Sequence, residues 1–99
     1  MTRVLVYGDS NSWGTPSNGS GVRYDVKTRW PQVMATALGW EVAEENLPGR
    51  TTRHDDDMML GSAMNGLLHL PVALKSQSPV DWLLIMLGTN DFKARFEQD

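Results

Sequence analysis

Val4-Leu5-Val6-Tyr7-Gly8-Asp9-Ser10 decides the fold of this chain, because a short apolar run is followed directly by small polar residues. Consecutive apolar residues without alternation are typical of a strand that is buried on both faces of a parallel sheet. The glycine ends the run, and the serine follows where a strand gives way to a helix N-terminus. The stretch predicts the first strand of an α/β sheet, with a polar loop at its carboxyl end.

A loop and an amphipathic helix come next. Residues 14–21 combine glycine, proline, serine and asparagine, a composition that predicts a flexible loop. From Trp30 to Leu38, apolar residues recur at helical spacing. They predict a helix with Thr28 as its N-cap, Pro31 in its first turn and Gly39 after its last turn.

Three further segments complete a β-α-β-α-β order. We expect a second strand at Trp40 to Glu44, a helix from Met64 to Lys75 with Pro71 in its first turn, and a central third strand at Trp82 to Leu87. Between them, Asp55-Asp56-Asp57 predicts a solvated acidic turn. Strands that alternate with helices form parallel sheets through right-handed crossovers. The order therefore predicts an α/β fold with a parallel sheet.

Composition and charge exclude several classes of protein. Of 99 residues, 9 are basic and 12 acidic, and the net charge of -3 argues against a nucleic-acid-binding surface. The chain has no cysteine, which excludes disulfides, thiolate metal sites and a cysteine nucleophile. Its longest apolar run, Trp82–Leu87, is far shorter than the roughly 20 residues that cross a bilayer. With no secretory signal after Met1, we expect a cytoplasmic location and no membrane partner.

Glycine and small polar residues follow each predicted strand, and in open α/β sheets ligands bind beyond the carboxyl ends of the strands. The three loops at that edge are residues 8–12, 48–52 and 88–91. A base would make the Ser10 hydroxyl a nucleophile, and the amides of Ser10 and Gly49 with the side chain of Asn90 are candidate donors to an oxyanion. Taken singly, Ser10 and Asn90 are better explained as a helix cap and a turn residue.

Together, these loops resemble sequence blocks of the SGNH, or GDSL, hydrolases. Gly8-Asp9-Ser10, Gly49 and Gly88-Thr89-Asn90-Asp91 are similar to the first, second and third blocks of that superfamily. The motifs that resemble its bacterial arylesterase and acyltransferase group are Gly8-Asp9-Ser10-x-x-Trp13-Gly14, Arg29-Trp30, Arg50-Thr51-Thr52 and Met86-Leu87-Gly88-Thr89-Asn90-Asp91. The ordered set covers nearly the whole chain.

The resemblance implies a flavodoxin-like, three-layer α/β/α fold with a parallel sheet of order 2-1-3-4-5, of which this chain supplies strands 2, 1 and 3. It implies that Ser10 is a nucleophile and that Gly49 and Asn90 complete an oxyanion hole with the Ser10 amide. The reaction implied is hydrolysis of a small carboxylic ester, or transfer of its acyl group, without a cofactor or metal. The expected substrate-binding residues are Asp9, Asn11, Trp13, Arg50, Thr89 and Asp91.

Two departures from the family pattern are visible. Asn11 stands where the GDSL signature has leucine, which changes loop packing. The fourth block, Asp-x-x-His, which supplies the base and its orienting acid, is missing, so residues 1–99 resemble the N-terminal half of one domain. We therefore expect an exposed edge at Trp82–Leu87 and association with a complementary C-terminal chain, or self-association. The full domain is expected to form a homo-oligomer.

Weaker signals and alternative functions stay open. His54 and His69 are local candidates for the missing base, although packing or surface roles are favoured for both. Arg50 is expected either at an anionic substrate group or at nearby carboxylates, and Phe92 with Phe96 predicts a short helix. The competing functions are a flavodoxin-like module that binds phosphate or a nucleotide, and an inactive assembly fragment.

Overall fold

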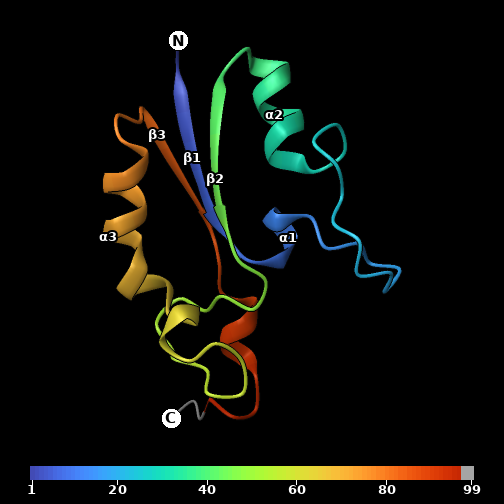
Figure 1. Ribbon diagram of the computed structural model, residues 1–99, viewed down its shortest axis with the longest axis vertical. Helices are drawn as coiled ribbons and strands as arrows, with labels where there is room; N and C mark the ends of the chain where they lie inside the picture. The colour runs from blue at the N-terminus through green and yellow to red at the C-terminus, as the bar shows by residue number, and fades with distance from the viewer. Residues whose placement is uncertain (97–99) are drawn as a thin grey trace.

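The computed structural model describes residues 1–96 and contains a three-stranded parallel sheet (Figure 1). The strand β1 (Arg3–Gly8) lies between β2 (Glu41–Asn46) and β3 (Trp82–Met86), and it pairs in parallel with both. This arrangement confirms the predicted fold class and the strand order 2-1-3.

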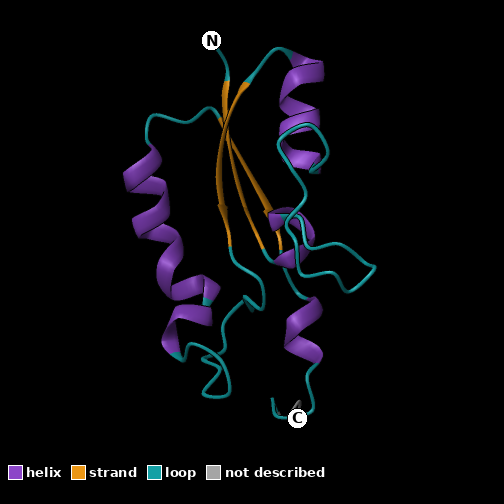
Figure 2. Ribbon diagram, turned by 45° about the vertical axis from the view of Figure 1, so that its right-hand side comes forward, coloured by secondary structure: helices purple, strands orange, loops and turns teal. Residues whose placement is uncertain are grey.

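Helices cover both faces of the sheet. The one-turn α1 (Ser10–Trp13) and α2 (Trp30–Leu38) lie on one face, and α3 (Gly66–Gln77) lies on the other (Figures 1 and 2). Two 3-10 helices, η1 (Ser62–Met64) and η2 (Thr89–Phe92), lie beyond the carboxyl ends of the strands, at the end of the molecule away from the N-terminus. The layers place the loops that carry the sequence motifs at that end.

The core is built around β1. Val4, Leu5 and Val6 are completely buried, and Tyr7 is nearly so. Because side chains alternate along a strand, an unbroken apolar run fits only a strand with a layer on each side. The Tyr7 hydroxyl donates to the carbonyl of Gly66 at 2.7 Å and so fixes the start of α3 against the sheet.

The predicted N-cap of α2 is wrong. Arg29, and not Thr28, is the N-cap, and it makes no side-chain capping bond. The amide of Thr28 donates to Asp25 O at 3.0 Å, which places this threonine in the preceding turn. The Arg29 guanidinium pairs with Glu44 of β2 at 3.0 Å and holds the helix start on the sheet. Pro31 lies in the first turn, as predicted.

The position of Pro71 also differs from the prediction. Asn65 caps α3 through its side chain, which accepts from the Leu68 amide at 3.3 Å. The helix therefore begins far enough before Pro71 for the proline to lie in its interior. Asparagine is among the strongest N-cap residues, so a local side-chain bond determined this boundary.

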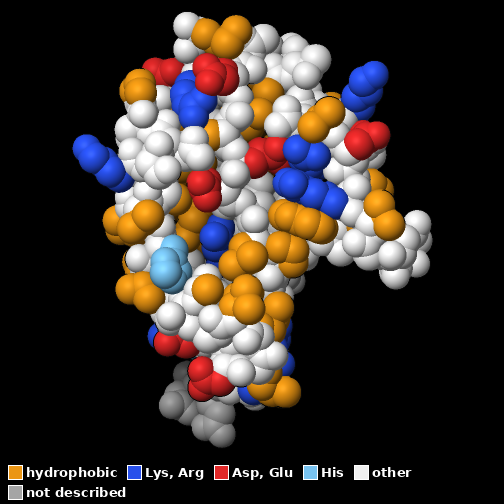
Figure 3. Space-filling view, viewed as in Figure 1, with side chains coloured by type: hydrophobic (Ala, Val, Ile, Leu, Met, Phe, Trp, Pro, Cys, Tyr) orange, Lys and Arg blue, Asp and Glu red, His pale blue; other side chains and the backbone are white. Residues whose placement is uncertain are grey.

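In the described chain, β3 is an edge strand and not the centre of the sheet. Its only strand partner within residues 1–96 is β1. The side chains of Trp82 and Ile85 are more than half exposed, and the apolar Leu67 and Val72 of α3 are exposed as well. Hydrophobic side chains are also visible over α3 and the lower loops in Figure 3. The edge that the sequence predicted to be uncovered is therefore open.

Within residues 1–96, no helix combines the length and the apolar character that a membrane span requires.

Candidate active site

Ser10 begins α1 at the carboxyl end of β1. The preceding residue, Asp9, is the N-cap, and its carboxylate accepts from the amide of Asn11 at 3.1 Å. Ser10 itself is half-buried. Neither its hydroxyl nor its amide hydrogen has a hydrogen-bond partner among residues 1–96. The hydroxyl and the first free amide of the helix are thus both available to a ligand.

Gly49 occupies a tight turn after β2. The Arg50 amide donates to Leu47 O at 3.0 Å, with Pro48 and Gly49 as the central residues of the turn. Gly49 has a φ of 89°, the conformation that the third residue of a type II turn requires. A Cβ at this position would lie 2.7 Å from Sδ of Met59. The Gly49 amide donates to no acceptor within the described chain, so it is a second free donor.

Replacing Gly49 with alanine will destabilise the fold by about 2–4 kcal/mol, because left-handed strain adds to overpacking against the methionine. Gly39, after α2, is the matched control: its φ is also positive, but a Cβ there meets nothing within 4 Å. Gly39→Ala should therefore show only the strain, about 1–2 kcal/mol. Urea unfolding measures both. Equal losses of unfolding free energy in the two variants would show that close packing at Gly49 does not add to the destabilisation.

Asn90 of η2 brings the three loops together. Its side-chain amide donates to the carbonyl of Arg50 at 3.2 Å and lies 3.5 Å from a carboxylate oxygen of Asp9. Arg50 follows Gly49, and Asp9 precedes Ser10, so one side chain joins the neighbours of the other two candidate residues. The contact with Asp9 is at the limit of a hydrogen bond and is therefore the weaker of the two. The roles of Ser10, Gly49 and Asn90 in catalysis stay predictions.

The six residues expected to bind substrate have different environments. Asp9 and Arg50 are buried, whereas Asn11 and Thr89 are exposed. Trp13 is half-buried, with the guanidinium of Arg23 4.8 Å from its ring centroid. Contact of these residues, and of Asp91, with a substrate remains a prediction.

Asp91 connects η2 to the loop that follows Gly49. Its carboxylate accepts from the Thr52 amide at 2.9 Å and from the Thr52 hydroxyl. His54 Nε2 lies 3.9 Å from the same carboxylate. The imidazole of His54 also stacks on Phe96, with ring centroids 4.7 Å apart. Sequence reasoning missed the pairing of Asp91 with Thr52, because the two residues lie 39 positions apart and no local pattern relates them.

The predicted helix through Phe92 and Phe96 is therefore wrong. The 3-10 helix η2 ends at Phe92, whose side chain is exposed, and Phe96 contacts His54 instead of an apolar helix face. His69, the other histidine, is on α3, where its Nε2 lies 2.8 Å from Ser62 O. That contact agrees with the packing role favoured for it, and a base role for either histidine stays untested.

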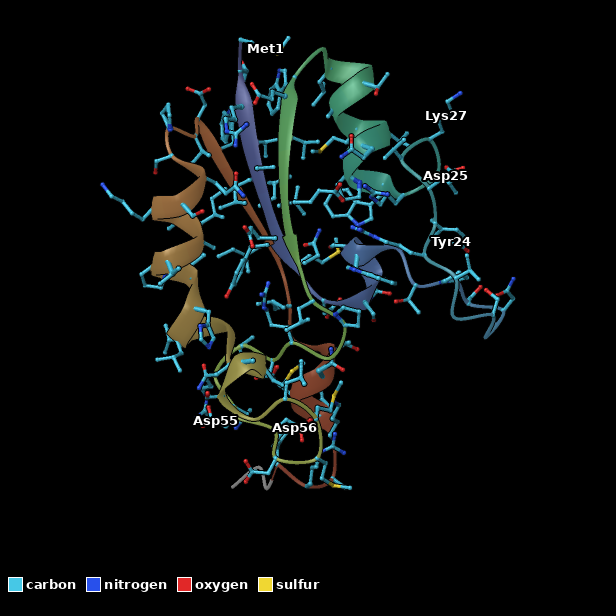
Figure 4. All side chains as sticks on the ribbon, in the orientation of Figure 1. Met1, Tyr24, Asp25, Lys27, Asp55 and Asp56 are labelled. Carbon is cyan, nitrogen blue, oxygen red and sulfur yellow. The ribbon has the colours of Figure 1, made fainter. Side chains whose placement is uncertain are left out.

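Asp56 corrects the prediction of a solvated acidic turn. Its side chain is buried, and Arg95 donates to its two oxygens at 2.8 and 2.7 Å. Figure 4 labels Asp56 in the loop between β2 and α3. Lys93 adds a contact at 3.2 Å. The two cations come from the segment after η2, which the sequence pattern did not place beside this loop. Hydrogen bonds from Arg95, aided by Lys93, hold the pKa of Asp56 well below its usual range despite burial.

This ion cluster makes a pH-dependent contribution to stability. Because the pKa of Asp56 is lower in the folded than in the unfolded chain, the contribution is complete above the unfolded value of about 4 and is lost as the pH falls below it. The stability difference between the wild type and Asp56→Asn should be largest above about pH 5 and should narrow toward about pH 2. Denaturant unfolding at several pH values measures it. The exposed neighbour Asp57, as Asp57→Asn, is the control, and a difference independent of pH would contradict the prediction.

Arg50 supports the strand ends from the α3 face. Its guanidinium lies 4.0 Å from the ring centroid of Tyr7 and donates to Glu45 O at 2.5 Å. Burial lowers the pKa of Arg50, against the opposing influence of Tyr7 and Glu45. No group of three or more potential metal ligands occurs among the described residues.

Comparison with known proteins gives a consistent result. The family model for GDSL-like lipase/acylhydrolase matches residues 4–99. A carbohydrate acetylesterase family member from Sinorhizobium meliloti is 39% identical, with a TM-score of 0.88, over 98% of this chain and 46% of that chain. The aryl esterase of M. smegmatis is 40% identical, with a TM-score of 0.89, over 99% of this chain and 47% of that one. A search of curated proteins finds no match.

A more distant structure shows the fold alone. The family two carbohydrate esterase from Clostridium thermocellum is 20% identical, with a TM-score of 0.66. The chain spans a little less than half the length of the two more similar structures. The family match covers nearly all of residues 1–99, and Asn90 contacts the loops that contain Ser10 and Gly49. The chain therefore belongs to the GDSL-like lipase/acylhydrolase family.

Proposed function

We propose that this chain supplies the nucleophile and oxyanion hole of a serine-dependent carboxylic ester hydrolase. The observation that carries the proposal is the Asn90 side chain, which contacts both the loop of Ser10 and the loop of Gly49. The Ser10 oxygen attacks the ester carbonyl, and its proton passes to a base. The amides of Ser10 and Gly49, with the Asn90 side chain, donate to the oxygen on which negative charge develops.

In this proposal, the general base that accepts the Ser10 proton is not among residues 1–99. A serine hydroxyl is a weak nucleophile until an adjacent base accepts its proton. The Asp-x-x-His block supplies that base in the family that the sequence resembles. The protonated histidine then gives its proton to the leaving alcohol, and water releases the acid from the acyl-enzyme. An alcohol or a peroxide in place of water would make the reaction an acyl transfer.

The open edge of β3 is the proposed docking surface for the polypeptide that carries Asp-x-x-His. The similar structures contain roughly as much chain again as the part that residues 1–99 match. An unpaired strand edge offers a row of backbone donors and acceptors, and an added parallel strand satisfies them. The exposed Trp82 and Ile85 would be covered in the same step. This makes a complementary C-terminal chain a better occupant than a second copy, which lacks the fourth block.

Short-acyl and aryl esters are the proposed substrates, because the similar structures are called carbohydrate acetylesterase and aryl esterase. Reaction with a fluorophosphonate tests the proposal directly, since the reagent bonds covalently to an activated serine. In the presence of the complementary chain, mass spectrometry should locate the label on the peptide that contains Ser10. Labelling of another residue, or no labelling of a folded complex, would reject Ser10 as the nucleophile.

A further inference from the structure

The α3 face of the sheet contains a cavity whose lining includes none of the proposed catalytic residues Ser10, Gly49 and Asn90. It has a volume of about 300 Å³ and lies between β1, β2, α3 and the loop after β2. Its lining is Tyr7, Glu45, Leu47, Arg50, Ala63, His69, Val72, Ala73 and Ser76. Tyr7 and Glu45 are register partners on β1 and β2, so their side chains share this face. Ligand sites are typically about 300–1,000 Å³, which makes this cavity suitable for a small molecule.

The opposite charges of Arg50 and Glu45 line the cavity without a direct ion pair between them. Within residues 1–96, neither Arg50 nor Glu45 forms an ion pair. The Nε of Arg50 is buried and has no hydrogen-bond partner. Glu45 accepts one bond, at 3.0 Å, from the uncharged amide of Gln77. Arg50 is buried and Glu45 half-buried, and the two charges attract each other without forming a direct ion pair. A charge removed from water is unfavourable unless a partner compensates it, so a ligand that supplies both counter-charges fits this arrangement.

The other residues that line the cavity indicate the chemical character of the uncharged part of the ligand. Leu47, Ala63, Val72 and Ala73 are apolar. The hydroxyl of Tyr7 is already bonded to Gly66 O, and His69 Nε2 is within hydrogen-bond distance of Ser62 O. A simple anion would meet repulsion from Glu45, and a simple cation would meet repulsion from Arg50. A neutral apolar molecule would leave both charges desolvated.

We propose that this cavity binds a small zwitterion of the aliphatic α-amino acid class. Its carboxylate pairs with the guanidinium of Arg50, its ammonium with the carboxylate of Glu45, and its side chain contacts Val72 and Ala73. The backbone carbonyl of Arg50 accepts from Asn90, so the cavity and the candidate active site share this residue. The proposal does not depend on ester hydrolysis, because it rests on the charges and shape of the cavity.

Three small molecules test the proposal. L-valine carries both charges, isovalerate carries only the carboxylate, and isobutylamine carries only the ammonium. Each is titrated into the ¹⁵N-labelled chain, with any polypeptide that co-purifies, at constant ionic strength. Valine should cause saturable shifts at the amides of Leu47, Val72 and Ala73. Each singly charged analogue should bind at least about tenfold more weakly, a difference of about 1.4 kcal/mol. No saturable shift with valine, or equal binding of an analogue, would overturn the proposal.

Variants locate the site without disturbing buried groups. Val72 lines the cavity and is 69% exposed, so Val72→Trp should obstruct it without loss of folding and abolish the valine shifts. Leu68→Trp is the control, because Leu68 is 56% exposed on the same helix but does not line the cavity. This variant should bind valine normally.

Glu45→Gln removes the negative charge of the cavity and should make isovalerate bind at least as tightly as valine. Normal valine binding by a folded Val72→Trp protein would place the ligand elsewhere.

Discussion

Ser10→Ala will lower the kcat of the completed enzyme by about 10⁶-fold, the loss found when a serine hydrolase is deprived of its nucleophile. The alanine leaves the helix start and its amide in place, because the cap of α1 is formed by Asp9 and Asn11. The loss of kcat therefore measures the contribution of the Ser10 hydroxyl to catalysis, and it does not reflect a loss of folding. Release of a coloured alcohol from a short-acyl aryl ester measures it, and unfolding by denaturant should show little change.

Ser17→Ala is the matched control, since this serine lies exposed in the loop after α1. It should retain full activity and the same response to a fluorophosphonate. Retention of more than about a tenth of the wild-type turnover by Ser10→Ala would exclude an acyl-enzyme at this residue.

Supplying a C-terminal half will raise ester turnover by a similar factor, about 10⁶-fold over the chain alone, because the serine then gains its base. The corresponding half of the M. smegmatis aryl esterase is a practical source, since that protein is 40% identical over the shared part. Co-expression followed by size-exclusion chromatography should yield one complex, and the aryl ester assay should detect its activity.

A substitution at the β3 edge separates docking from chemistry. Ile85 is 54% exposed on β3, and Ile85→Lys places a charge where the added polypeptide must bury apolar surface. Val22→Lys is the control, because Val22 is 70% exposed in the loop before α2. The first variant should weaken the complex at least about tenfold, and the second should not. Equal complex formation by both would place the docking surface away from β3.

Sequence patterns predicted the elements whose signals are local. The unbroken apolar run at Val4–Tyr7 identified a buried strand, since such a run needs cover on both faces, whereas the central position predicted for Trp82–Leu87 belongs to β1 in the described chain. The loops that contain Gly49 and Asn90 were assigned to one edge because carboxyl ends of parallel strands coincide. The contacts of Asn90 with the loops of Ser10 and Gly49 agree with that assignment.

Errors occurred where a competing interaction decided the boundary. Thr28 has the residue type of an N-cap, but Asp25 holds its amide in a turn, and the pairing of Arg29 with Glu44 fixes the helix start. Pro71 suggested the first turn of α3, yet the Asn65 cap lies earlier, and the helix continues through the proline. In both cases the local preference was real but weaker than another contact.

The sequence by itself determined the order of strands and helices, the family, and the three loops that form the candidate site. Only the tertiary structure paired Asp56 with Arg95, paired Asp91 with Thr52, and brought the opposite charges of Arg50 and Glu45 to one cavity. The physical reason is range: strand and turn signals come from neighbouring residues, whereas the partner of a buried charge comes from distant parts of the chain that meet only after folding.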